Sequence, residues 1–164
     1  MMADNDNDKE KGDGFFGSFK PITATTVRVD YDLPTSVLVR GGEYDWVHEL
    51  VDDEKFKPEE TGTAEFDVEF VHYPQSTSYI KAVADLEERG LRPLTFHELL
   101  SFGIQYPEKQ KEYAITAHGD YWEDDRGYRL LGVLHYTAEQ GRMLNLVWLA
   151  HGVQSGVRIA ATRV

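Results

Sequence analysis

Hydrophobic and polar residues alternate along several short segments of the chain. Residues 63–73 carry apolar side chains and one histidine at every second position, namely Ala64, Phe66, Val68, Phe70 and His72. Acidic residues occupy the positions between the first four of them, at 65, 67 and 69. Alternation with a period of two predicts a β-strand that has one buried and one solvated face. A shorter alternation predicts a second strand at residues 26–31.

The C-terminal part of the chain contains four further strand patterns. They cover residues 112–117, 127–137, 143–150 and 156–163, and residues 138–142 have the composition of a turn. Strands joined by such short connections predict an antiparallel meander.

The region between the two groups of strands has helical features. Ser76 or Ser78 can cap a helix that runs to about Arg89, and Gly90 suits the left-handed position after its end. The side expected to be buried contains Ile80, Val83, Ala84 and Leu86.

A second helix is predicted from Phe96 to about Gln105, because Pro107 stops it. Thr95 and Glu98 have the spacing of a capping box, and leucines at positions 94 and 99 occupy the two positions of a hydrophobic staple. These features direct folding and carry no catalytic meaning.

Taken in order, the elements predict an α+β domain in which two helices pack on an antiparallel sheet. Residues 34–42 add one or two helical turns between Pro34 and two glycines. We expect a disordered acidic tail at 1–18, a strand and loop region at 19–75 joined to the core, and the α+β core at 76–164. Three phenylalanines interrupt the polarity of the N-terminal segment and can dock on the domain or on a partner: Phe15, Phe16 and Phe19.

Charge and composition narrow the range of functions. The chain has 29 acidic and 17 basic residues, a net charge of −12, so its surface repels phosphates and we expect no nucleic-acid partner. It has no cysteine, which excludes thiol catalysis and cysteine-ligated metals. Neither a membrane-spanning segment nor a secretion signal is recognisable, so we expect a cytoplasmic protein without a membrane partner, with association with a virion as an alternative.

No motif spells out a reaction. The phosphate-binding loop, the dinucleotide fingerprint and the nucleophile elbow are all missing from the sequence, and no two of the six histidines have the H-x-x-x-H or H-x-H spacing. A metal site assembled across the fold from His118, His135 and His151 stays an open alternative. The acidic stretch HGDYWEDDRG at 118–127 does not follow the EF-hand spacing and is interpreted as a solvated loop. We therefore expect no cofactor, no metal and no catalytic residues.

Tryptophans beside small polar residues offer a different kind of site. Such groups suit recognition surfaces, although both indoles can equally pack in the core beneath their loops. The candidate ligand-binding residues are Trp148, His151, Gln154 and Ser155, followed by Trp122 and Asn145.

Several motifs in the second half of the chain resemble those of a known fold. The motif R-P-x-T-x-x-E-L, a later Gly-Asp-Tyr-Trp and a closing G-V-R-x-x-x-x-R resemble the cysteine-free branch of the C-type-lectin-like fold, as in formylglycine-generating-enzyme-like domains and the variable proteins of diversity-generating retroelements. A group of uncharacterised bacterial and phage-associated proteins is also similar. The matching residues are Arg92, Pro93, Thr95, Glu98, Trp122, Gly156, Arg158 and Arg163.

The resemblance implies a binding module and leaves its ligand open. Calcium-dependent sugar binding by such lectins uses E-P-N or Q-P-D, which this chain lacks, and the oxidase activity of the related enzymes needs cysteines. We therefore expect a non-enzymatic module that presents loops to a protein or carbohydrate ligand. Two alternatives are a structural or accessory protein of a phage or mobile element, acting through an oligomeric or partner interface, and an enzyme using carboxylates and histidines from 118–151.

Overall fold

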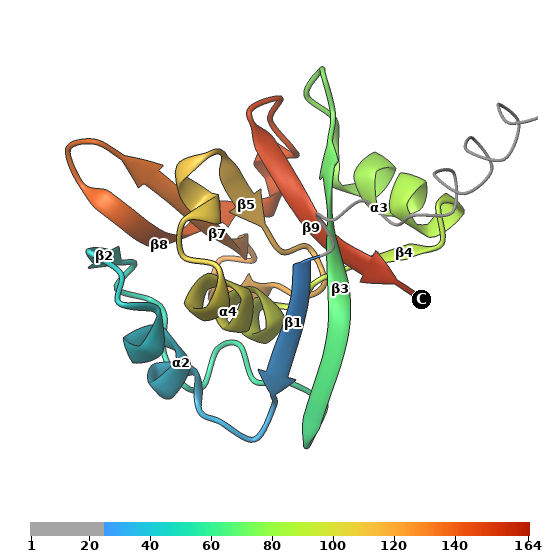
Figure 1. Cartoon of the computed structure of the whole chain (residues 1–164). Helices are drawn as coiled ribbons and strands as arrows, with labels where there is room; N and C mark the ends of the chain where they lie inside the picture. The colour runs from blue at the N-terminus through green and yellow to red at the C-terminus, as the bar shows by residue number, and fades with distance from the viewer. Residues whose placement is uncertain (1–24) are drawn as a thin grey trace, which may run out of the picture.

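A mixed nine-stranded sheet with three α-helices makes up residues 25–164, the part of the chain that the computed structural model describes. The strands are β1 (Thr25–Asp30), β2 (Trp46–Val47), β3 (Thr63–His72), β4 (Leu91–Pro93), β5 (Ala114–Thr116), β6 (Trp122–Glu123), β7 (Arg129–Thr137), β8 (Gly141–Trp148) and β9 (Val157–Arg163). The helices are α2 (Thr35–Gly42), α3 (Tyr79–Glu88) and α4 (Phe96–Gln105), with 3-10 turns η1 (Lys109–Lys111) and η2 (Leu149–His151). The predicted α+β class is confirmed (Figure 1).

The expectation of a purely antiparallel sheet is wrong. The strand order is β1-β3-β9-β5-β7-β8-β2, with β4 added to β9 and β6 to β7. Most neighbours are antiparallel, but β5 runs parallel to β9 and β2 runs parallel to β8. Both parallel pairs join segments far apart in the sequence, so no local pattern announces them. The helical turns predicted at residues 34–42 are confirmed as helix α2.

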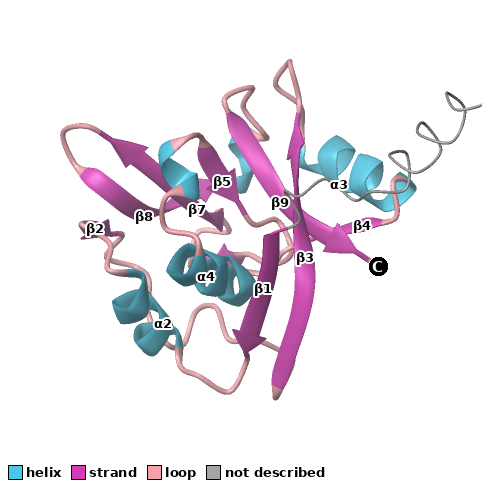
Figure 2. Ribbon diagram, viewed as in Figure 1, coloured by secondary structure: helices cyan, strands magenta, loops and turns pink. Residues whose placement is uncertain are grey.

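Helices α3 and α4 cover opposite faces of the sheet. Along β9, Ala160 packs in the large core beside α4, whereas Ile159 and Ala161 pack in a smaller core beside α3. Successive residues of a strand point to opposite faces, so the two helices lie on different sides. Figures 1 and 2 show them separated by β1, β3 and β9.

The predicted alternation of buried and exposed residues along β3 fails at its C-terminal end, next to the smaller core. Val71 is buried beneath α3, and His72, which was expected on the buried face, is exposed. The prediction for α3 is also wrong in part, because Ile80 and Ala84 are exposed, Ile80 to 78%, whereas Ala82 and Leu86 are buried. Around a helix, Ile80 lies about 120° from Leu86, so the two cannot share one narrow buried face.

The turn into α4 forms as predicted. Thr95 and Glu98 make both hydrogen bonds of the capping box. The Glu98 carboxylate is fully buried and also accepts hydrogen bonds from both terminal nitrogens of Arg92 and from the Tyr31 hydroxyl, at 2.6–3.0 Å. A residue that sequence alone marks as a helix cap therefore also ties β1 and β4 to α4.

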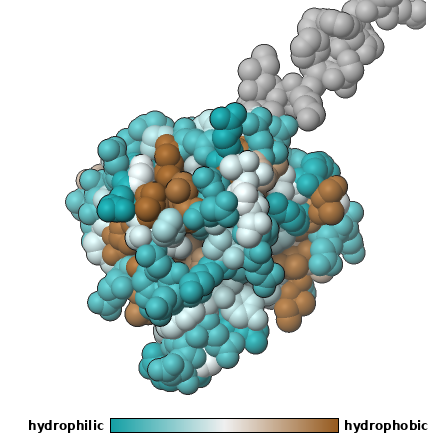
Figure 3. All heavy atoms as spheres, turned by 90° about the horizontal axis from the view of Figure 1, so that it is seen from below, coloured by the Kyte–Doolittle hydropathy of each residue, from teal (hydrophilic) through white to brown (hydrophobic). Residues whose placement is uncertain are grey.

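Seen from below in Figure 3, the surface is mainly hydrophilic, and hydrophobic groups occur as separate clusters rather than as one continuous area. None of the helices in residues 25–164 is long and apolar enough to cross a membrane. The tail predicted at 1–18 and its phenylalanines lie outside the described residues.

Candidate functional site

The face of the sheet that carries α3 is only partly covered by that helix. Beyond it, a groove of about 180 Å³ lies over β5, β7 and β8 and is closed on one side by the β8–β9 connection. The lining consists of Thr116, His118, Leu131, Val133, Val147, Trp148, His151, Gly152, Val153, Gln154 and Val157. None of these lining residues, all within 25–164, is an aspartate, glutamate, lysine or arginine.

The β8–β9 connection is held in place by the segment that leads into α3. Thr77 and Val153 exchange two backbone hydrogen bonds of 3.0 and 2.8 Å, and the Ser76 hydroxyl donates to the Gln154 side chain. His72 donates from Nε2 to the backbone oxygen of Ser155 at 2.6 Å. The two loops, which are neighbours at the upper end of the sheet in Figure 2, thus form one fixed rim.

A glycine allows this rim to lie so close. Gly152 has a φ of +66°, which glycine adopts without strain, and a Cβ there would lie 2.4 Å from the backbone oxygen of Thr77. The rim therefore depends on the absence of a side chain at this position.

Aromatic rings line the mouth of the groove. Trp148 is 46% exposed, and its ring stacks on Tyr128 with a centroid distance of 5.3 Å and an angle of 10°. His151 lies against the same indole at 5.2 Å. The Arg126 guanidinium lies 5.1 Å from the Tyr128 ring. An indole held on its neighbours in this way offers a flat apolar surface with little freedom left to lose on binding.

His118 forms part of the groove wall and is almost completely buried. Its ring stacks on Tyr79 at 5.6 Å, and neither ring nitrogen has a hydrogen-bond partner among the described residues. Burial lowers the pKa of His118 to about 4, so the imidazole is neutral at physiological pH. A neutral imidazole has one N–H donor and one acceptor nitrogen, a combination that matches a hydroxyl group.

The groove brings together half of the six candidate residues. Trp148, His151 and Gln154 line it. Ser155 lies on the rim outside the lining and contributes its backbone oxygen to His72. Asn145 is on β8, where its side chain accepts a hydrogen bond from the next backbone N–H.

Trp122 lies elsewhere. It is half-buried against the large core and carries Lys55 over its ring at 5.3 Å. Trp122 belongs to β6 and pairs with Leu130 of β7, and β6 falls within the stretch interpreted as a solvated loop. The neighbouring Asp120 is half-buried and accepts a hydrogen bond from the backbone of Phe96, and His118 is buried, so the interpretation as a solvated loop is wrong at these three residues.

The three histidines of the alternative metal site do not come together. His118 and His151 line the groove, whereas His135 is absent from its lining. Within residues 25–164 no group of three or more histidines and carboxylates is arranged to hold a metal ion.

Sequence reasoning did not include His118 among the ligand-binding candidates. The available signal is the alternation in AITAH, because Thr116 and His118 share one face of the strand and its extension while Ile115 and Ala117 face the large core. Polar residues that alternate with core residues lie on the sheet face opposite the large core. Whether α3 covers that face at this point depends on the length of the helix.

Comparison with protein-family models, with curated proteins and with solved structures finds no match. The resemblance to the C-type-lectin-like fold therefore stays an expectation, and the site has to be interpreted from its own chemistry.

Proposed function

We propose that the protein is a non-enzymatic binding module whose groove takes an uncharged ring that carries hydroxyl groups, as a sugar unit of a carbohydrate does. The observation that supports this most is the neutral, unpartnered His118 in the wall of a groove without charged side chains. A charged ligand would lose its hydration there without gaining an opposite charge.

The remaining lining fits the same ligand. One face of a sugar ring is apolar and can pack on the exposed indole of Trp148, while Gln154 and His151 at the rim can exchange hydrogen bonds with hydroxyl groups. A volume of about 180 Å³ suits one such ring rather than a long chain. Access to the nitrogens of His118 requires a small movement of the wall, because each has less than 1 Å² exposed.

One feature of the groove favours binding over catalysis. No carboxylate, hydroxyl or second imidazole among the described residues lies within hydrogen-bond distance of the His118 nitrogens. A histidine that acts as a general base needs such a partner to orient it or to be activated by it.

The alternative of an interface at the sheet edge has less support. The free edge of β1 is occupied by side chains of α4 and the residue after it: Gln105 bonds to the backbone N–H and oxygen of Arg28, and the Tyr106 hydroxyl donates to the oxygen of Thr26. A strand from a partner would have to displace these contacts.

The proposal is tested by screening immobilised neutral and charged glycans, together with a peptide library, against the full-length protein and its Trp148→Ala variant. We expect binding to neutral glycans that falls at least about tenfold in the variant, since stacking and apolar contact at a buried hot spot exceed 1.4 kcal/mol.

Trp46→Ala is the matched control. Trp46 is 42% exposed and packs edge-on against His48, but it lies on β2, which pairs with β8 at Met143, near the opposite end of that strand from Trp148. Its variant should bind as the parent protein does. Binding of peptides alone would assign the groove to a protein ligand, and equal losses in both variants would remove it as the site.

A further inference from the structure

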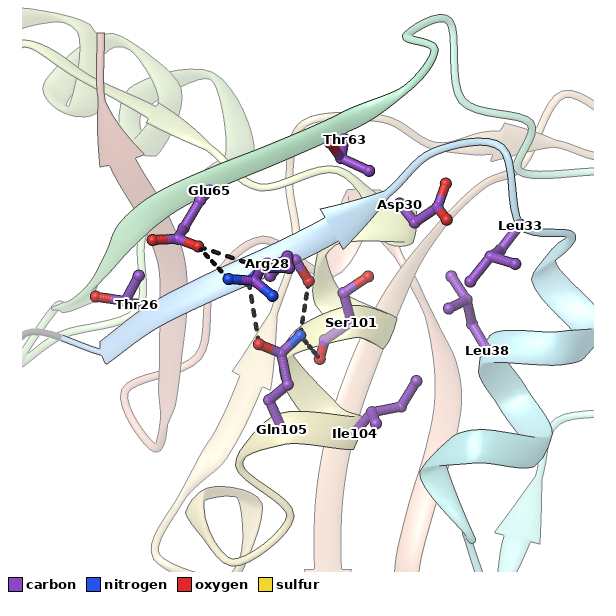
Figure 4. A pocket seen from close by; sticks show the side chains of 10 residues that line it. All are labelled: Thr26, Arg28, Asp30, Leu33, Leu38, Thr63, Glu65, Ser101, Ile104 and Gln105. Carbon is purple, nitrogen blue, oxygen red and sulfur yellow. Dashed lines mark hydrogen bonds and ion pairs between the residues drawn. The ribbon is translucent and has the colours of Figure 1, made fainter.

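A second and larger groove lies along β1, the strand at the opposite end of the sheet from β8 and β2, and shares no lining residue with the first groove. It has a volume of about 580 Å³ and is bordered by β1, β3, α2 and α4. Figure 4 shows its ten lining residues: Thr26, Arg28, Asp30, Leu33, Leu38, Thr63, Glu65, Ser101, Ile104 and Gln105.

The polar groups along most of this groove are already paired. Arg28 forms an ion pair with Glu65 at 3.1 Å, and Gln105 bonds to the backbone of Arg28 and of Ser101. Asp30 is different, because its carboxylate accepts only the N–H of Asp32 and is not paired with a lysine or arginine among the described residues. The groove therefore has one carboxylate left for a cation.

Apolar side chains gather at one end. Leu33 and Leu38 lie next to each other in Figure 4, with Ile104 below them on α4, and Leu33 is 37% exposed. Leu38 is buried and Ile104 is half-buried, so Leu33 supplies most of the exposed apolar surface at this end of the groove. An exposed apolar side chain beside an open groove favours an apolar occupant.

We propose that the occupant is the chain's own segment 15–20, FFGSFK. This proposal is independent of the function assigned to the first groove. The 24 residues before Thr25 end at the strand that forms the groove wall, since β1 begins at Thr25 and lines the groove from Thr26 to Asp30. Phe19 is six residues from Thr25, and six residues span up to about 20 Å, which is the length of β1.

The composition of the segment matches the groove. Three phenylalanines stand in an otherwise polar stretch, and Lys20 follows the last of them. Phenyl rings can cover the leucine and isoleucine side chains, while the lysine supplies the cation that Asp30 lacks. Docking within one chain also has the advantage of a high effective concentration.

The absence of cysteine permits a direct test in the full-length protein. A spin label on Ser18→Cys should broaden the methyl NMR signals of Leu33, Leu38 and Ile104, so that they lose most of their intensity, while methyl groups at the β2 edge stay sharp. A label on Asn5→Cys, farther from the phenylalanines, should have a much smaller effect.

Substitution of Phe15, Phe16 and Phe19 by serine should restore the methyl intensities, and the control with Asp4, Asp6 and Asp8 replaced by serine should not. Unchanged intensities with the Ser18 label, or broadening that survives the loss of the phenylalanines, would overturn the proposal. Broadening between separately labelled chains in a mixed sample would do the same, since the groove would then hold a second copy.

Discussion

Asp120 is half-buried, and its carboxylate lies at the N-terminus of α4. Its side chain accepts a hydrogen bond of 2.7 Å from the backbone N–H of Phe96. Burial raises the pKa of Asp120 to about 6, and the negative charges of Glu98, Glu60 and Glu59 add to the effect. The Asp120 side chain therefore supplies a hydrogen-bond acceptor to the helix N-terminus, but its surroundings disfavour the ionised form of the carboxylate.

This arrangement predicts a pH-dependent stability. Between its ordinary pKa of 3.8 and about 6, the folded protein retains a proton on Asp120 that the unfolded chain has released. The stabilisation is therefore complete below the ordinary pKa and is lost as the pH rises through about 6. Asp120→Asn keeps the capping oxygen but cannot ionise, so the free energy of unfolding of the variant should gain about 1–2 kcal/mol on the parent between pH 4 and 7.

Urea unfolding of both proteins across that pH range measures the difference. A difference that does not change with pH would show that Asp120 carries no such penalty.

Short elements and their connections decide which surfaces remain open. The edge of β1 would expose unpaired backbone groups if Gln105 and Tyr106 did not bond to them. The β8–β9 connection is fixed over the sheet by Thr77 and by the glycine at 152.

Removing the Gln105 side chain should therefore expose the backbone edge of β1. In Gln105→Ala, the backbone N–H and oxygen of Arg28 lose their partner, and we expect a loss of about 1 kcal/mol in the free energy of unfolding together with concentration-dependent association. Urea unfolding and light scattering after size exclusion measure the two effects. Gln140→Ala, in the exposed β7–β8 turn, is the control, and identical behaviour of the two variants would contradict the covering role of Gln105.

The rim of the first groove offers a test based on two glycines. In Gly152→Ala, the new methyl group meets the Thr77 oxygen in a backbone conformation that L-residues rarely adopt, so the rim should move and ligand affinity should fall at least about tenfold, or 1.4 kcal/mol.

Gly156→Ala lies four residues away in the same connection, where a Cβ would meet nothing within 4 Å. It should bind as the parent does. Similar affinities for both variants, measured by calorimetry with the glycan found in the screen, would contradict the role of the fixed rim.

The whole molecule is a sheet covered unequally on its two faces. The α4 face is closed by the large core, whereas α3, with ten residues, covers only the part around β3, β4 and β9. The first groove lies where that cover ends. Its position thus depends on where α3 ends and on the β8–β9 connection that closes its side.

Local parts of this arrangement were predictable from the sequence. The capping box at Thr95 and Glu98 uses contacts three residues apart, and the alternation from Ala64 to Phe70 needs only the period of a strand. The C-terminal strands β7, β8 and β9 lie within two residues of their predicted bounds.

Features that depend on distant pairing were not predictable. The parallel pair β5–β9, the burial of Val71 and the exposure of Ile80 are set by which segments meet in space. For the same reason, Trp122 stayed among the candidates behind Trp148, and only the fold places Trp148 at the groove and Trp122 against the core.

The most direct measurement follows the three indole N–H signals in the NMR spectrum of the full-length protein during titration with a neutral glycan from the screen. We expect the Trp148 signal to shift saturably, while the signals of Trp46 and Trp122 stay in place. A ligand that binds without moving the Trp148 signal, or that moves the Trp46 signal instead, would contradict the claim that the groove left open beside α3 is the binding site.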